Sequence, residues 1–207
     1  MKKSIVKKLG IMILAGVLMV SAAGCGKNET ASKDAGNVVA SDGEMFAADD
    51  LSAGQVKLLG KVYEVPVDYS KVSKKLTLRD EMTEQFNVKV APKSTLSNVY
   101  LDVYNKENSH VVVSLTNNRN EEDYPKACQI TAITADSNYA DGSVITLPGD
   151  VTLGTSAYDI TGKYGEPDTS IDSKDGFTYI YEKGSLTYTF DFLKDAEGVS
   201  KITIESK

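Results

Sequence analysis

The sequence has no tryptophan, one histidine and two cysteines among 207 residues. A single histidine argues against a transition-metal centre, which usually combines several imidazole or thiolate ligands. The chain also lacks a Gly-rich phosphate loop and the His-Glu-x-x-His, Cys-x-x-Cys and Gly-x-Ser-x-Gly motifs. We therefore expect a protein that is not an enzyme, with no cofactor and no catalytic, cofactor-binding or metal-binding residues.

Basic residues are also few, with 23 Lys and Arg against 29 Asp and Glu. Four of the lysines precede Cys25, where there is no acidic residue. Without that segment, nineteen basic residues remain and the formal charge falls from −6 to about −10. Nucleic acids and anionic membrane surfaces both require a basic patch, so the balance predicts no nucleic-acid partner.

The first 24 residues have the pattern of a secretory signal. Four lysines within the first eight residues form a positive segment, and residues 9–20 form an apolar one. The small residues 21–24 then lead directly to Cys25. Uncharged sequence runs from residue 9 to 26, so an uncleaved membrane anchor and ordinary secretion remain alternatives.

A signal that ends on cysteine resembles the lipobox of bacterial lipoproteins, although Ala22 stands where that family prefers leucine. The resemblance implies that the Cys25 thiol carries a lipid, with cleavage before it and a palmitate-type acyl chain on its amine. It also implies a cell-membrane protein, lipid-anchored on the extracytoplasmic face, whose membrane contact is the lipid anchor.

Composition divides the rest of the chain. Small, polar and acidic residues dominate 25–50, which predicts a disordered tether after the 1–24 signal. A weak repeat follows, in which Gly60–Asp68 aligns with Gly142–Asp150 at an offset of 82 residues. We expect an α+β fold of two similar units in tandem, each a short helix packed on an antiparallel sheet: an N-terminal unit, 51–140, and a C-terminal unit, 141–207.

The C-terminal unit has the clearer local signals. Thr155 or Ser156 can cap a helix that continues through Tyr164, with Ser156-x-x-Asp159 approximating a capping box. Gly165 in a left-handed conformation would end it. Alternation then predicts a meander of three strands, within 177–182, 186–192 and 201–205, whose apolar face the helix covers.

The N-terminal unit has looser connections. Apolar residues Tyr69, Val72 and Leu76 recur at helical spacing, and polar sequence at 105–109 predicts a turn between two strands. The strands expected in this unit cover residues 86–90, 99–104, 110–115 and 129–133.

Gly154-Thr155-Ser156, Asp159-Ile160 and Tyr164-Gly165-Glu166-Pro167 together resemble the helix signature of the SmpA/OmlA (BamE-like) family. Those small lipoproteins place a helical segment before a three-stranded antiparallel sheet. Tandem copies of a similar unit form the β-lactamase-inhibitor-protein fold. The whole chain also resembles unassigned lipoproteins of Gram-positive anaerobes. The resemblance implies a fold, while the activities of these families do not transfer with it.

Several residues deserve inspection as sites, although a structural role is expected for each. Cys128 stands alone if Cys25 is lipidated, and a nucleophile would need His110 as its base. The acidic loop 118–123 lacks the spacing of a calcium loop. Glu182 and Asp191 are carboxylates on the polar side of the strands. Tyrosines could bind carbohydrate: Tyr179, Tyr181 and Tyr188 are expected in the core, whereas Tyr63, Tyr100 and Tyr104 are less well placed.

Three functions remain. The leading hypothesis is a non-enzymatic extracytoplasmic binding module for a protein or envelope component, using its sheet or polar loops. The second is an inhibitor of an exported enzyme, and the third is an enzyme of unknown chemistry. A deep pocket with convergent polar groups would favour the enzyme, whereas an open sheet would favour binding.

Overall fold

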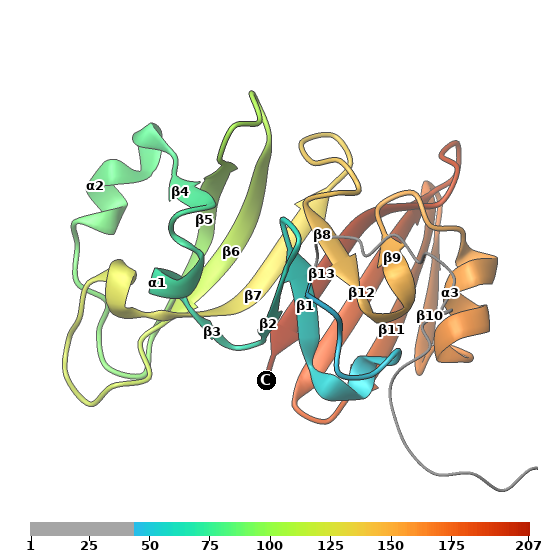
Figure 1. Cartoon of the computed structure of the whole chain (residues 1–207), viewed down its shortest axis with the longest axis horizontal. Helices are drawn as coiled ribbons and strands as arrows, with labels where there is room; N and C mark the ends of the chain where they lie inside the picture. Colours follow the sequence, from blue (N-terminus) through green and yellow to red (C-terminus); the bar gives the residue numbers. More distant parts are fainter. Residues whose placement is uncertain (1–43) are drawn as a thin grey trace, which may run out of the picture. The chain divides into compact units, whose positions relative to one another are not determined.

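The computed structural model describes residues 44–207 (Figure 1). Cys25, the signal segment and most of the expected tether lie outside the described residues. Within the described part of the chain, no helix is long and apolar enough to span a bilayer. The fold is α+β and rich in antiparallel sheet.

A nine-stranded antiparallel sheet dominates the described residues (Figure 1). Its path is β10-β11-β12-β13-β7-β6-β5-β4, and the short β3 pairs with β7. Two four-stranded meanders, β4–β7 and β10–β13, therefore meet where β7 pairs with β13. The strands are β3 (Val67–Asp68), β4 (Leu76–Leu78), β5 (Thr95–Val103), β6 (His110–Thr116), β7 (Gln129–Asp136), β10 (Thr169–Ser173), β11 (Gly176–Lys183), β12 (Leu186–Leu193) and β13 (Val199–Ser206).

A second sheet of four strands has the order β2-β1-β8-β9. It comprises β1 (Gln55–Leu58), β2 (Lys61–Glu64), β8 (Ile145–Leu147) and β9 (Val151–Thr152). The two repeated sequence segments supply β2 and β8, which flank β1 on either side. Each of these strands ends shortly before a proline, as expected from a residue that cannot donate to a ladder.

Helices are short. They are α1 (Tyr69–Val72), α2 (Thr83–Phe86) and α3 (Ala157–Tyr164), with 3₁₀ turns at Leu51–Ala53, Asp80–Met82, Pro125–Ala127 and Pro148–Asp150. The predicted cap of α3 is confirmed: the Ser156 hydroxyl accepts from the Asp159 amide at 3.1 Å. Gly165 ends α3 with the expected positive φ, but with an extended ψ rather than the left-handed helical value.

One face of the large sheet forms the core. Along β12, Leu186, Tyr188, Phe190 and Phe192 are buried and alternate with partly exposed residues. Helix α3 packs on this face, with the Tyr164 ring 5.8 Å from Tyr181 and 6.2 Å from Phe190. The Tyr188 hydroxyl donates to the Leu51 carbonyl, 137 residues away in sequence. The core joins both meanders and the small sheet in one cluster.

Four details differ from the sequence predictions. Residues 86–90 are not a strand: Phe86 ends α2, its ring contacts Tyr69 edge-on at 5.3 Å, and Val90 makes a single bridge to Asp123. The helix at Tyr69 stops after one turn, and Leu76 begins β4. The C-terminal meander has a fourth strand, β10, which alternation missed because all five of its residues are exposed. Finally, contacts extend upstream of residue 51, where the Glu44 carboxylate accepts from the Val62 amide at 3.0 Å.

Candidate functional site

The face of the large sheet opposite the core is its outer face, defined here by three rows of cross-strand neighbours. In antiparallel sheets, paired residues point to the same side. Most of these side chains stay partly exposed, whereas the residues that alternate with them on β5–β7, β12 and β13 are mostly buried. The first row crosses seven strands and is rich in threonine: Thr169, Ile180, Thr189, Thr203, Thr134, Val112 and Tyr100.

The second row carries charges. The Thr178 hydroxyl donates to Asp191 at 2.7 Å, and Asp191 pairs with Lys201 at 3.1 Å. Lys201 is the register partner of Asp136, and the β6–β7 register extends to place His110 beside Asp136. Asp102 is the partner of His110 on its other side. The third row is Glu182, Thr187, Glu205, Ala132 and Ser114.

His110 is the most buried member of the outer face, with 6% of its surface exposed. Its ring lies between two tyrosines, with centroids 4.5 Å from Tyr139 and 5.4 Å from Tyr100. Burial, followed by the nearby Arg79 charge, lowers the pKa of His110, although Asp102 and Asp136 oppose the shift. The imidazole is therefore neutral at pH 7, with one donor and one acceptor nitrogen.

Two polar atoms in this region have no hydrogen-bond partner among the described residues. They are Nδ1 of His110 and Oγ of the adjacent Ser109, and both are buried. A buried polar atom without a partner costs about 1–3 kcal/mol. Such groups are rare in folded proteins and mark this region as unusual.

Arg79 covers the same end of the sheet. Its Nε and Nη2 atoms both donate to Asp102 Oδ1, at 2.9 and 2.7 Å, and its guanidinium lies 5.5 Å from the Tyr100 ring centroid. The hydrogen bonds to Asp102 raise the pKa of Arg79. These contacts link Arg79, which directly follows β4, to two side chains of β5.

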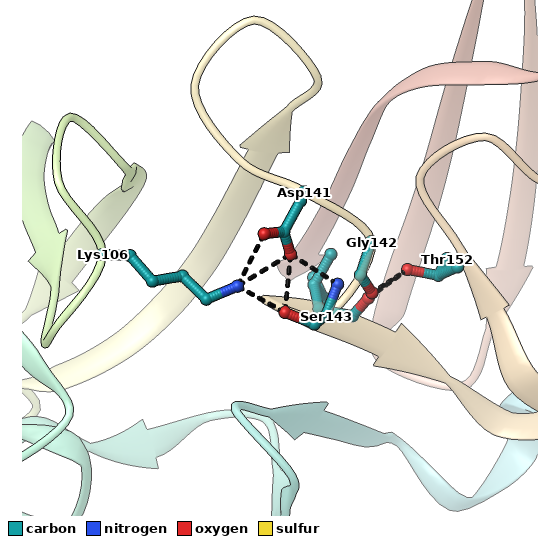
Figure 2. A network of polar contacts seen from close by, with 6 residues as sticks. Lys106, Asp141, Gly142, Ser143 and Thr152 are labelled. Carbon is teal, nitrogen blue, oxygen red and sulfur yellow. Dashed lines mark hydrogen bonds and ion pairs between the residues drawn. The ribbon is translucent and has the colours of Figure 1, made fainter.

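Lys106, in the turn between β5 and β6, reaches the loop that follows β7 (Figure 2). Its Nζ donates to Asp141 Oδ2 at 2.7 Å and also contacts the Ser143 hydroxyl. The Ser143 amide donates to Asp141 Oδ1 at 2.8 Å. These bonds, led by the one from Lys106, lower the pKa of Asp141 to about 2. The network holds the β5–β6 turn and the β7–β8 loop together.

Two open hollows border this network. One, of about 600 Å³, is lined by the Arg79–Glu81 turn, Asp102, the β5–β6 turn, His110 and Tyr139. The other, of about 650 Å³, extends along the β7–β8 loop to Gly154 and the start of β13. Both contain the segment 106–109 and Tyr139. Because the two hollows share these lining residues, we call them together the hairpin groove.

Cys128 and His110 do not form a catalytic pair. His110 begins β6, whereas Cys128 immediately precedes Gln129, the partner of Thr116 at the far end of β6. Six residues of strand separate the two ends by about 20 Å. Cys128 is buried, and burial raises the pKa of its thiol, which therefore stays protonated and unreactive at neutral pH.

The carboxylates Glu182 and Asp191 are also apart. Glu182 is opposite Thr187, four residues from Asp191 along β12, a separation of about 13 Å. Paired glycosidase carboxylates lie at most about 9.5 Å apart. Each is instead paired with a lysine, Glu182 with Lys207 at 2.9 Å and Asp191 with Lys201 at 3.1 Å.

The loop 118–123 is organised by the buried Asn117. Its amide donates to the carbonyls of Val90 at 2.9 Å and Glu121 at 2.8 Å, and its Oδ1 accepts from the Arg119 amide at 3.0 Å. Arg119 also forms an ion pair with Asp123. Residues 44–207 contain no group of three His, Cys, Asp or Glu side chains placed to hold a metal ion.

The tyrosines divide largely as expected. Tyr181 and Tyr188 are buried, and burial raises the pKa of each to about 12, while Tyr179 lies partly buried at the edge of the core. Tyr63 is buried as well, and Tyr104 is 61% exposed. Tyr100, beside His110, is the one of the three inspected tyrosines that belongs to the candidate site.

Sequence reasoning missed Arg79, Tyr139 and the Lys106–Asp141 pair. Each comes from a turn or loop, and the cross-strand register of His110 brings them together. The sequence signal nearest to these residues was the short apolar run after His110. That run predicted the strand that begins at His110, but it did not indicate which residues would lie beside the strand.

No protein-family model matches the chain, and no curated protein sequence matches it either. Among solved structures, it is similar to a DUF4309 family protein (YjgB) from Bacillus subtilis. The two are 10% identical, the match covers 68% of this chain and 93% of the other, and the TM-score is 0.33. That TM-score is too low to assign a shared fold.

Proposed function

We propose that this chain is a non-enzymatic, extracytoplasmic binding module that holds a protein or envelope component on the outer face of its large sheet. The observation that supports it is the row structure of that face. One row has seven cross-strand neighbours, mostly threonine, and a second row has four charged residues, all at least partly exposed on an antiparallel scaffold: Asp102, Asp136, Asp191 and Lys201. Rigid sheets position side chains for recognition more accurately than loops do.

The proposal includes a lipid anchor at Cys25, which keeps the folded part outside the cell membrane. Its support is the signal pattern that ends on that cysteine. Labelling of cells with a radioactive fatty acid tests it, because Cys25→Ala should abolish the label. Persistent label on the variant would refute the anchor.

We also propose that the two meanders are similar units in tandem, as in the β-lactamase-inhibitor-protein fold. The strand order supports this, since it reads the same outward from the β7–β13 pair in both directions. Each meander follows a helix, α1 or α3, and each repeated segment supplies a strand of the small sheet.

An inhibitor of an exported enzyme is the second candidate. The observation that favours it is the exposure of Tyr104 and Tyr139, 61% and 52%, in connecting segments rather than in the sheet. Exposed tyrosines are frequent anchors at protein interfaces. An inhibitor would bind through these loops, whereas the leading proposal uses the sheet.

Affinity capture from cell envelopes distinguishes binding through the sheet from binding through the loops. The purified full-length protein is immobilised beside two variants, Thr203→Arg in the centre of the outer face and Tyr158→Arg on the exposed side of α3. We expect Thr203→Arg to lose the captured component and Tyr158→Arg to keep it. Equal capture by both variants would contradict binding at the sheet.

A further inference from the structure

We infer that the hairpin groove binds an uncharged oligosaccharide. This inference rests on the proposed function, because it names the chemistry of the envelope component and places it at the His110 end of the outer face. Four observations lead to it: the shape of the groove, its aromatic surface, its unpartnered polar atoms and its charge.

The shape fits an elongated ligand. The groove has two parts that share the lining segment 106–109 and Tyr139, and one part reaches Arg79 while the other reaches Gly154. Its combined extent exceeds that of a single small molecule, and both parts are open to solvent. A chain of several linked units would fill it better than one compact ligand.

Tyr139 provides the aromatic surface. Half of its surface is exposed, while its contact with the His110 ring at 4.5 Å and an interplanar angle of 32° fixes its orientation. The C–H faces of sugar rings pack on aromatic rings of this kind. A preoriented tyrosine loses little side-chain entropy on binding, which favours such contacts.

His110 and Ser109 provide hydrogen-bonding capacity. Both line the groove, His110 is more than nine-tenths buried, and the unpartnered atoms Nδ1 and Oγ lie within these two residues. A sugar hydroxyl can both donate and accept, as a neutral imidazole and a serine hydroxyl require.

The charges of the groove exclude anionic ligands. The two cations of the groove, Arg79 and Lys106, are already paired with Asp102 and Asp141. The remaining charges in the lining are carboxylates, at Asp80, Glu81, Glu107 and Glu197. Phosphorylated or carboxylated ligands would be repelled, since they need a free cation.

An extended peptide is a poorer fit as well. Peptides that add to a sheet use unpaired backbone groups. Around the groove, backbone amides are already bonded: His110 donates to Tyr139 at 3.1 Å, Tyr139 to Asp136 at 2.9 Å and Ser109 to Lys106 at 3.3 Å. Side-chain recognition of an uncharged, hydroxyl-rich chain is the chemistry that remains.

Calorimetric titration of the full-length protein in detergent tests this. The probes are the tetrasaccharides of chitin, cellulose, amylose and mannan. We expect saturable binding of at least one. Tyr139→Ala should weaken it by about tenfold or more, equivalent to about 1.4 kcal/mol, whereas Tyr139→Phe keeps the ring and the affinity. Tyr158→Ala, on the exposed side of α3, is the matched control.

His110→Phe adds a second test, because it preserves the ring contacts and removes the nitrogens. Circular dichroism and thermal unfolding verify that it folds, and its affinity should fall toward that of Tyr139→Ala. Binding of none of the tetrasaccharides, or equal affinity of the Tyr139→Ala and Tyr158→Ala proteins, would overturn the inference. The envelope capture experiment gives a further test. If protease treatment of the envelopes and Thr203→Arg each abolish capture, the captured component is a protein bound at the sheet. That result would overturn the oligosaccharide inference and leave the proposed function intact.

Discussion

The two meanders have the same strand order but are stabilised in different ways. In β10–β13, aromatic rings fill the core and an eight-residue helix with a side-chain cap covers them. In β4–β7, the buried residues are mostly aliphatic, and α1 is a single turn with no side-chain cap. Instead, polar contacts from loops hold the first meander, through Asn117 and the Arg79–Asp102 pair.

This difference assigns the two meanders different roles, with stability in the second meander and recognition in the first. Burial of large aromatic side chains contributes more stabilisation than loop hydrogen bonds, so the second meander can serve as a scaffold. The first meander carries His110, Tyr100 and most of the hairpin groove. The unpartnered Nδ1 of His110 and Oγ of Ser109 lower the stability of this meander, and burial in the shared core offsets that loss.

The largest predicted effect comes from removing an aromatic ring. Phe190→Ala should lower the free energy of unfolding by about 3–5 kcal/mol, because its ring is fully buried against Tyr164 and Tyr181. Leu101→Ala, equally buried in the first meander, should cost about 2–5 kcal/mol and less than Phe190→Ala. Urea titrations followed by tyrosine fluorescence and by circular dichroism measure both.

Those titrations also test whether the meanders are independent. One core and the β7–β13 ladder join them, so we expect a single transition in each protein, with both probes coinciding. Two transitions, with each variant shifting only one, would show that the meanders unfold separately.

A smaller effect is expected at Asn117. Asn117→Ala removes the donor to the Glu121 carbonyl and one of the two donors to the Val90 carbonyl, which keeps the Asp123 amide, and should cost about 1–3 kcal/mol. Asn118→Ala is the control, because its exposed amide bonds only to Gln129, and we expect a change within about 0.5 kcal/mol. Thermal unfolding of the two variants measures the difference in stability. Equal unfolding midpoints would show that the Asn117 hydrogen bonds do not stabilise the first meander.

The helix cap has a smaller effect still. Ser156→Ala should cost about 1 kcal/mol, because the Asp159 amide loses its acceptor. Ser170→Ala, on the exposed strand β10, serves as the control. Chemical denaturation measures the free energy of unfolding of each variant. If Ser156→Ala lowers it no more than Ser170→Ala does, the cap does not stabilise α3, and α3 would then resemble the uncapped α1.

The smallest predicted effect is the pH dependence of the Lys106–Asp141 pair. The pKa of Asp141 falls from 3.8 to about 2 on folding, so its stabilisation is full above pH 3.8 and is lost as the pH falls to about 2. Solvent screens the pair, because the Asp141 side chain is 63% exposed and that of Lys106 is 30% exposed, and this limits the effect to less than about 1 kcal/mol. The unfolding free energies of wild type and Asp141→Asn, measured from about pH 5 downward, should converge across this window. A constant difference would contradict the assignment.

Much of the fold was predictable where local rules agree. Alternation located β11, β12 and β13, and Ser156 and Gly165 located the two ends of α3, because each signal acts within a few residues. The same rules failed at residues 86–90, where Phe86 packs on Tyr69 from a helical turn. They also failed at β10, whose exposed residues carry no alternation to read.

The candidate site was less predictable for a different reason. His110 lies next to Asp136 and Asp102 only through the register of three strands, and Tyr139 reaches it from a loop. Register depends on which faces are buried across the whole sheet, so it cannot be read from any single strand. Tyr100 was identified for inspection because it stood outside the clearest alternation.

The last strand of the chain lies in the middle of the large sheet. β13 pairs with β12 on one side and β7 on the other, so a nascent chain that ends before Val199 lacks the link between the meanders. The β7–β13 ladder therefore cannot form before residues 199–206 have been made, so neither meander can complete the large sheet by itself.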